Sequence, residues 1–162
     1  MNGAITVGIS DLNATKAPGE LVTYALGSCV GICLYDPVMK IAGLSHIMLP
    51  CSKNFSDASK NPYKFADTAI VLLVRKMQCL GASPTRLKAK IAGGAQMFAA
   101  AGNSSLANIG NRNVVAVKQE LARLHIPIIA EDTGANYGRT LYFSAESGIM
   151  RIKSVTRGEA SW

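Results

Sequence analysis

The chain has 162 residues, of which 49% are hydrophobic and 17% charged, and its formal net charge is +7. Because domains of roughly 100 to 150 residues are the commonest, we expect residues 1–162 to form a single domain. The longest apolar stretch, Ala69 to Val74, is far shorter than the roughly 20 residues of a membrane-spanning helix, and no charged and then apolar leader opens the sequence. These features argue against membrane insertion and export, and they predict a cytoplasmic protein.

The net charge and the spacing of the cysteines indicate which partners and which kinds of site to expect. A net charge of +7 favours an acidic partner, but the basic residues are scattered and only 6% of residues are aromatic, which disfavours nucleic acid as that partner. In a reducing compartment the four cysteines are expected to stay free. None of them has the paired C-x-x-C spacing of a zinc site and the chain has 2 histidines, so we expect no metal and no cofactor.

The first elements predicted are a strand, a turn and a hairpin. Residues 21–26 are apolar and strand-like, and they end at the turn pair Gly27-Ser28. Residues 30–35 alternate with a period of two, Asp36-Pro37 breaks the pattern, and residues 41–49 are strand-like again. Residues 29–49 therefore predict one β-hairpin that turns around Pro37-Val38.

The hairpin predicts which residues face each other across its two strands. In an antiparallel pair, the residue numbers of directly opposed residues always add up to the same sum. If Asp36 faces Met39, then Cys29 faces His46. Directly opposed residues have Cβ atoms about 4.5 to 5.5 Å apart, close enough for a hydrogen bond between sulfur and imidazole. A register slip of one residue would separate the two side chains.

The rest of the chain alternates helices with strands. Residues 51–61 are polar and loop-like, Pro62 is expected at the first position of a helix that ends at Gly81, and a second helix is expected over residues 111–124. Strands are expected over residues 87–91, 126–131, 139–144 and 149–155. Because strands outnumber helices and hairpins dominate, we predict an α+β fold with mainly antiparallel or mixed sheet packed against two or three helices.

Cys29 and His46 are the candidate nucleophile and base. A thiol becomes a useful nucleophile when a base takes its proton and backbone N–H groups stabilise the oxyanion, and the turn at Gly27-Ser28 can supply such groups. Without their pairing, a buried core cysteine and a satisfied core histidine would be the ordinary interpretations. Thr23 is the nearest candidate to orient the imidazole, although a threonine in a strand needs no such role.

Other polar or glycine-rich positions have simpler interpretations. His125 lies at the end of the second predicted helix, where an imidazolium is favourable without any catalytic role. No phosphate-loop pattern surrounds Gly93-Gly94, which we interpret as a tight turn, and Met97 and Phe98 after it are expected in the core. The segment 131–134 is interpreted as a strand end with a capped turn.

Several separated motifs, in order, resemble those of the chemoreceptor glutamine deamidases called CheD. The match covers nearly the whole chain and comprises Thr23-x-x-x-Gly27-Ser28-Cys29-Val30, Gly43-x-x-His46-x-x-Leu49-Pro50, Ala66-Asp67-x-Ala69, Ala89-Lys90-Ile91-x-Gly93-Gly94-Ala95-x-Met97-Phe98, Asn108-Ile109-Gly110-x-Arg112-Asn113 and Glu131-Asp132-Thr133-Gly134. Any one motif alone would be weak.

The resemblance implies an activity and a triad. The activity would be cysteine-dependent hydrolysis of specific glutamine side chains to glutamate, with release of ammonia, on methyl-accepting chemotaxis receptors. The family's Cys-His-Thr triad falls on Cys29, His46 and Thr23. The family's fold is likened to that of toxin deamidases, and some members bind CheC-type phosphatases. The chain departs from the family pattern at Phe65, where tyrosine is usual, and at Ala135, where a second glycine is usual.

The implied substrate agrees with the charge, since receptor methylation segments are acidic helices and opposite charge speeds encounter. Two other functions remain open at this stage. One is a regulatory binding module that docks on a CheC-type phosphatase or a receptor with little catalytic role. The other is a basic nucleic-acid binder, which the scattered charge disfavours.

Overall fold

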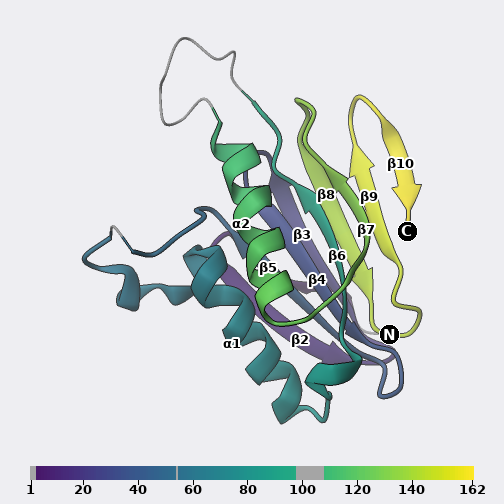
Figure 1. The fold of residues 1–162 in the computed structure, drawn as a ribbon. Helices are drawn as coiled ribbons and strands as arrows, with labels where there is room; N and C mark the ends of the chain where they lie inside the picture. The colour runs from purple at the N-terminus through teal and green to yellow at the C-terminus, as the bar shows by residue number, and fades with distance from the viewer. Residues whose placement is uncertain (1–2, 54, 98–107) are drawn as a thin grey trace.

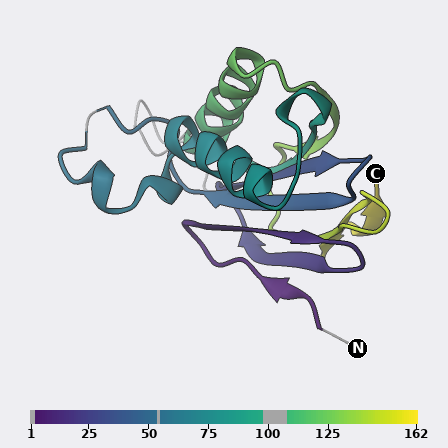
Figure 2. The same cartoon turned by 90° about the horizontal axis from the view of Figure 1, so that it is seen from below.

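Two five-stranded sheets lie face to face, and two α-helices cover the outer side of one of them (Figures 1 and 2). This computed structural model describes residues 3–53, 55–97 and 108–162. The first sheet has the order β1 (Ile5–Thr6), β3 (Glu20–Leu26), β8 (Arg139–Ser144), β9 (Met150–Ser154) and β10 (Gly158–Ser161). The second sheet has the order β2 (Asp11–Lys16), β5 (Ile41–Ile47), β4 (Val30–Asp36), β6 (Lys88–Gly93) and β7 (Ile128–Thr133).

The pairing of the strands confirms the predicted fold class. Both sheets are mixed, because β1 runs parallel to β3 and β6 runs parallel to β7. All other named pairs in the described residues are antiparallel. The helices are α1 (Ala66–Cys79) and α2 (Ile109–Arg123), with short 3-10 helices η1 (Ala58–Lys60), η2 (Pro62–Lys64) and η3 (Pro84–Arg86). Within the part of the chain that the structure describes, no helix has the length and apolar character to span a membrane.

The second sheet is buried on both faces, which explains why its central strands are almost entirely apolar. Val30, Ile32 and Leu34 of β4 pack with α1 and α2 in one core cluster. Cys33 of β4 and Leu44 of β5 point the other way, into a second cluster between the two sheets. A side chain of β4 or β5 therefore points either toward the helices or into the space between the two sheets. Only the second direction brings it close to the first sheet.

The helices follow the predicted periodicity, with one correction at the start of α1. Seven apolar residues recur at the helical spacing that predicts this helix. Five of them are buried against the second sheet and two are partly buried: Ala66, Ala69, Ile70, Leu73 and Met77, and Val74 and Leu80. The expectation that Pro62 opens this helix was wrong. Pro62 begins the separate 3-10 helix η2, and α1 begins at Ala66 after an extended residue. Proline suits the first position of either helix type, so the sequence could not separate the two.

The hairpin of β4 and β5 exists, but its predicted register was wrong by two residues. Asp36 pairs with Ile41, not Met39, and the partner of His46 is Gly31, not Cys29. The side chain of Asp36 explains the wider turn, because its Oδ1 accepts hydrogen bonds from two turn N–H groups, those of residues 38 and 39, at 3.0 and 3.1 Å. The connection therefore holds four residues, 37–40, a common length for hairpins.

The strands β1, β2 and β10 were not predicted, since β2 is polar at alternate positions and both β1 and β10 are fully exposed. Met97 was expected in the core, but 45% of its surface is exposed. Phe98, expected beside it, lies outside the described residues. The segment 131–134 is a strand end followed by a turn, as predicted, with Gly134 at a φ of +81°.

Candidate functional site

Three strands bring the predicted site residues to one end of the space between the sheets. Thr23 lies in β3 of the first sheet, His46 in β5 of the second, and Cys29 just before β4 begins. Thr23 and His46 are completely buried, whereas Cys29 is half-buried. The two-residue error in register preserves the side-chain face, because side chains alternate with a period of two. Cys29 and His46 therefore still face the same inter-sheet space.

The true register places Cys29 diagonally from His46 and not directly opposite it. Since Gly31 pairs with His46, the residue two positions earlier, Cys29, is its diagonal neighbour. Such neighbours on a regular ladder lie roughly 7 to 8 Å apart, still within reach of long side chains. Glycine at position 31 makes room for two side chains of the first sheet, because a Cβ there would lie 3.0 Å from Leu141 and 3.1 Å from Leu26.

The hydroxyl of Thr23 fixes which nitrogen of His46 carries the proton. Thr23 Oγ1 lies 2.7 Å from the carbonyl oxygen of Val7 and 2.7 Å from Nδ1 of His46. A hydroxyl has one proton to donate, and the Val7 carbonyl can only accept it. Thr23 Oγ1 must then accept a hydrogen bond from Nδ1–H. The other nitrogen, Nε2, is left as an unprotonated acceptor, and it is buried with no hydrogen-bond partner among the described residues.

Burial keeps both reactive groups neutral at pH 7. It lowers the pKa of His46 from 6.5 to about 4, because an imidazolium is poorly solvated between the sheets. Burial also raises the pKa of the Cys29 thiol, and a hydrogen bond with the backbone of Cys29 itself opposes this rise only in part. The resting site therefore holds a thiol and a neutral imidazole, not a preformed thiolate and imidazolium pair.

The backbone before Cys29 is a tightly held turn. Ala25 has a φ of +61°, and the N–H of Gly27 donates to the Ala25 carbonyl at 3.0 Å. On the other side, the carbonyl of Cys29 accepts a hydrogen bond from Gly94 N–H, and the carbonyl of Gly27 accepts one from Ala95 N–H, both at 2.8 Å. The Gly27-Ser28 pair thus shapes the turn, as predicted, while the N–H of Gly27 itself is already engaged.

Positions 93 and 94 require glycine because the backbone there lies very close to the turn before Cys29 and to helix α2. A Cβ on Gly93 would lie 2.3 Å from the Cys29 carbonyl oxygen, and one on Gly94 would lie 2.2 Å from a methyl group of Val114 in α2. Both glycines also have positive φ, at +105° and +64°. The interpretation as a tight turn therefore missed their main role, which is to let the backbone pack between the turn before Cys29 and helix α2.

Asn113 of α2 is a site residue that the argument from chemistry missed. It is completely buried, and its Nδ2 donates to the carbonyl oxygens of Ser28 and Met48, each at 2.9 Å. The only signal in the sequence was its place in the motif Asn108-Ile109-Gly110-x-Arg112-Asn113. An asparagine in a helix predicts no particular partner by itself, so only the fold reveals these contacts.

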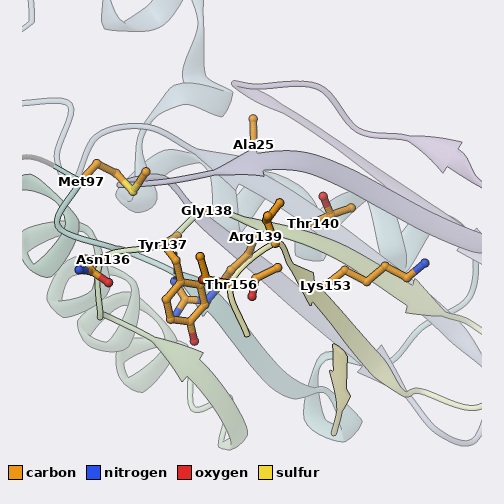
Figure 3. A pocket seen from close by; sticks show the side chains of 11 residues that line it. Ala25, Met97, Asn136, Tyr137, Gly138, Arg139, Thr140, Lys153 and Thr156 are labelled. Carbon is orange, nitrogen blue, oxygen red and sulfur yellow. Dashed lines mark hydrogen bonds between the residues drawn. The ribbon is translucent and has the colours of Figure 1, made fainter. Parts of the chain in front are cut away.

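A pocket of about 380 Å³ opens beside the turn before Cys29 (Figure 3). Its lining includes Ala25, Met97, Tyr137 and Arg139, and Met97 also lies against Gly27. The guanidinium of Arg139 lies 4.2 Å from the centre of the Tyr137 ring. Cys29 does not line this pocket. The guanidinium of Arg139 is itself buried and paired with Asp132, so the exposed basic residue of the lining is Lys153. The pocket lies next to the turn and is not the reaction centre itself.

The remaining polar candidates take structural positions. His125 is exposed just after α2, as its interpretation as a helix-end residue predicts. Asp132 lies 3.3 Å from the buried guanidinium of Arg139, and Glu131 accepts a hydrogen bond from Thr133 at 2.7 Å. Across residues 3–53, 55–97 and 108–162, no group of three or more His, Cys, Asp or Glu side chains is arranged to hold a metal ion.

Comparison with known proteins decides the family. The family model described as "CheD chemotactic sensory transduction" matches residues 48–154. A protein of Caldanaerobacter subterraneus subsp. tengcongensis is 55% identical over 154 residues, which cover 95% of this chain and 94% of the relative. The chain belongs to the CheD family. That relative, and the two below, are each named "Probable chemoreceptor glutamine deamidase CheD".

Other CheD relatives show the same extent of similarity. A protein of Clostridium novyi is 54% identical over 95% of this chain and 94% of its own length, and one of Syntrophomonas wolfei is 50% identical over 98% of both. These matches are long enough to include the N-terminal residues that the family model leaves out, where Thr23, Cys29 and His46 lie. Among solved structures, the hypothetical protein YfiH of Bacillus licheniformis matches 78% of this chain and 51% of its own, at 16% identity and a TM-score of 0.46.

Proposed function

We propose that this chain is a cysteine-dependent protein-glutamine deamidase that acts on chemoreceptors. The membership in the CheD family and the names of its relatives support the class of reaction and substrate. The observation that carries the choice of residues is the Thr23–His46 hydrogen bond, which leaves Nε2 of His46 free as a base in the space that Cys29 faces. We further propose that residues 1–162 work as one such domain in the cytoplasm.

The chemistry follows from the protonation states of the resting site. Nε2 of His46 accepts the proton of the Cys29 thiol while the sulfur attacks the δ-carbonyl carbon of a glutamine side chain. The developing oxyanion is stabilised by backbone N–H groups of the turn, for which we assign Ser28 N–H and not the already engaged Gly27 N–H. The Nε2 proton then passes to the amide nitrogen, which leaves as ammonia and gives a thioester.

The second half of the reaction uses the same groups. His46, neutral again, takes a proton from a water molecule whose oxygen attacks the thioester carbonyl carbon. The carbon–sulfur bond breaks, glutamate is released, and the Nε2 proton returns to the sulfur of Cys29. Thr23 touches neither substrate nor sulfur. Its role is to hold the imidazole in the tautomer in which Nε2 can accept a proton.

The charge and the pocket suggest how a substrate docks. A net charge of +7 favours the acidic helical segments of receptors and speeds their encounter with the enzyme. We propose that the pocket lined by Tyr137 and Lys153 receives a substrate side chain next to the target glutamine. A CheC-type phosphatase, which is likewise proposed as a partner, would compete with the receptor if it covered the same face.

The deciding experiment is incubation of a receptor cytoplasmic fragment with the parent chain and with Cys29→Ala. Conversion of glutamine to glutamate adds about one dalton at each modified site, which mass spectrometry of peptides resolves. We expect conversion by the parent alone and equal pull-down of the receptor by both proteins, because docking energy comes from the surrounding surface. Conversion by Cys29→Ala at the parent rate would reject the cysteine mechanism. Binding without conversion by the parent would instead indicate a regulatory docking module.

A further inference from the structure

Helix α2 reaches both halves of the proposed site through one side chain. Asn113 donates from Nδ2 to the carbonyl oxygen of Ser28, which directly precedes Cys29, and to that of Met48, two residues after His46. Both contacts measure 2.9 Å, and Asn113 is completely buried. A single amide nitrogen therefore ties the turn that carries the nucleophile to the strand end that carries the base.

The orientation of this amide is fixed by its partners. Both partners are carbonyl oxygens, which can only accept, so the side chain must present its NH₂ group to them. Its Oδ1 is then left buried and has no hydrogen-bond partner among the described residues. A buried acceptor without a partner is unfavourable for stability, but an apolar side chain of similar size would leave the carbonyl oxygens of Ser28 and Met48 without the donor that Asn113 supplies. The asparagine is therefore explained by the two backbone carbonyls that it joins and not by the filling of space.

The helix is held at a short and defined distance from the turn. A Cβ on Gly110 of α2 would lie 2.3 Å from the Ala95 carbonyl oxygen and 2.6 Å from that of Gly94. Gly94 in turn donates its N–H to the carbonyl of Cys29 at 2.8 Å. The helix backbone, the glycine segment and the nucleophile turn thus form a continuous stack, in which Asn113 makes the side-chain link.

We propose that Asn113 is a positioning residue that sets the distance between the Cys29 thiol and Nε2 of His46. The inference rests on the proposed function, since it concerns the same cysteine and histidine. The diagonal placement of Cys29 and His46 gives it a physical basis. Their strands do not pair them directly, so a third element must fix the separation over which the proton moves. A small displacement of either group lowers the rate of the chemical step without affecting substrate docking.

The test compares Asn113→Leu and the milder Asn113→Ser with Val117→Ala as a matched control. Val117 lies on the same helix, is completely buried and packs in the core between the helices and the second sheet. We expect both Asn113 variants to lose at least about tenfold in kcat on a receptor fragment with KM unchanged. Val117→Ala should lose stability to urea but keep kcat. Equal kcat in all four proteins would overturn the proposal.

A second readout does not require deamidation. In the parent, His46→Gln should slow alkylation of Cys29 by iodoacetamide, because the base is lost. In the Asn113→Leu background the same change should have little further effect, since the two groups are already uncoupled. Additive effects would overturn the role of Asn113 and leave the proposed function standing. If His46→Gln left alkylation unchanged in the parent, the cysteine and histidine would not be partners, and the proposed function would fall together with the inference.

Discussion

Removal of the Thr23 hydroxyl tests the proposed tautomer most directly. Thr23→Val keeps the shape of the side chain but deletes both hydrogen bonds of Oγ1, to the Val7 carbonyl and to Nδ1 of His46. Each buried group left without a partner costs about 1 to 3 kcal/mol. The hydrogen bond to Thr23 favours the Nδ1–H tautomer of His46 by an energy in the same range. If that preference is lost, kcat should decrease roughly 5- to 150-fold, since about 1.4 kcal/mol corresponds to a factor of ten in rate.

Thr23→Ser is the matched control for this change. It keeps the hydroxyl and loses one methyl group, which costs about 1 kcal/mol of stability. We expect its kcat to stay within a few-fold of the parent, while Cys29→Ala shows no detectable conversion. The assay is the time course of the mass gain in receptor peptides, with urea unfolding of each variant to confirm the fold. Equal damage by Val and Ser at position 23, with stability intact, would show that the methyl group packs and the hydroxyl has no catalytic role.

The other predictions concern protonation, close packing and burial. Burial lowers the pKa of His46 from 6.5 to about 4, so between these pH values the folded state binds fewer protons than the unfolded state. The free energy of unfolding, measured in urea, should therefore fall by up to about 3 kcal/mol as the pH drops from 6.5 to about 4. His46→Gln should abolish that dependence while a change at the exposed His125 should not, and kcat/KM should stay constant down to about pH 5. Gly94→Ala should lower kcat and stability, whereas Gly134→Ala, which shares a positive φ but has open space around it, should affect stability alone; equal kcat would contradict the packing argument. Cys33 is completely buried and its thiol pKa is raised by burial, so it should resist iodoacetamide until the chain unfolds; rapid labelling in the native state would contradict this.

The sequence pattern predicted that Cys29 and His46 lie on the same face of the hairpin, and this holds although the predicted register was wrong by two residues. The reason is the period of two in a strand, which makes an even error harmless to the choice of face. The exact register depends on the turn, and that turn depends on the Asp36 carboxylate. Burial acts to raise the pKa of this carboxylate, but hydrogen bonds from Arg86 and from backbone N–H groups outweigh burial and hold it at about 2. Arg86 lies 50 residues away in the chain, so no local pattern could reveal this contact.

Contacts between layers were the least predictable part of the site. Periodicity assigned Thr23 to a strand, but it could not show that this strand belongs to the opposite sheet and faces His46 across the interface. Likewise, the pattern of α2 identified its apolar face, on which Val114, Val117 and Leu121 lie, and was silent on the polar Asn113 among them. Local patterns determine which side of an element is buried. They do not determine which element from a distant part of the chain covers it.

The neutrality of the resting site has a consequence for selectivity. A thiol reacts with small oxidants and alkylating agents in its thiolate form, so burial that raises the pKa of Cys29 protects it in the free protein. The same burial lowers the pKa of His46, so the imidazole is not protonated before the substrate binds. In the proposed mechanism the proton then moves to Nε2 only as the sulfur attacks an electrophile within its reach. Reactivity therefore depends on how precisely a docked substrate and the elements around the turn place three atoms, the sulfur, Nε2 and the carbonyl carbon. A site of this kind gains its specificity from positioning, which is why residues that never touch the substrate, such as Thr23 and Asn113, are expected to affect kcat and not KM.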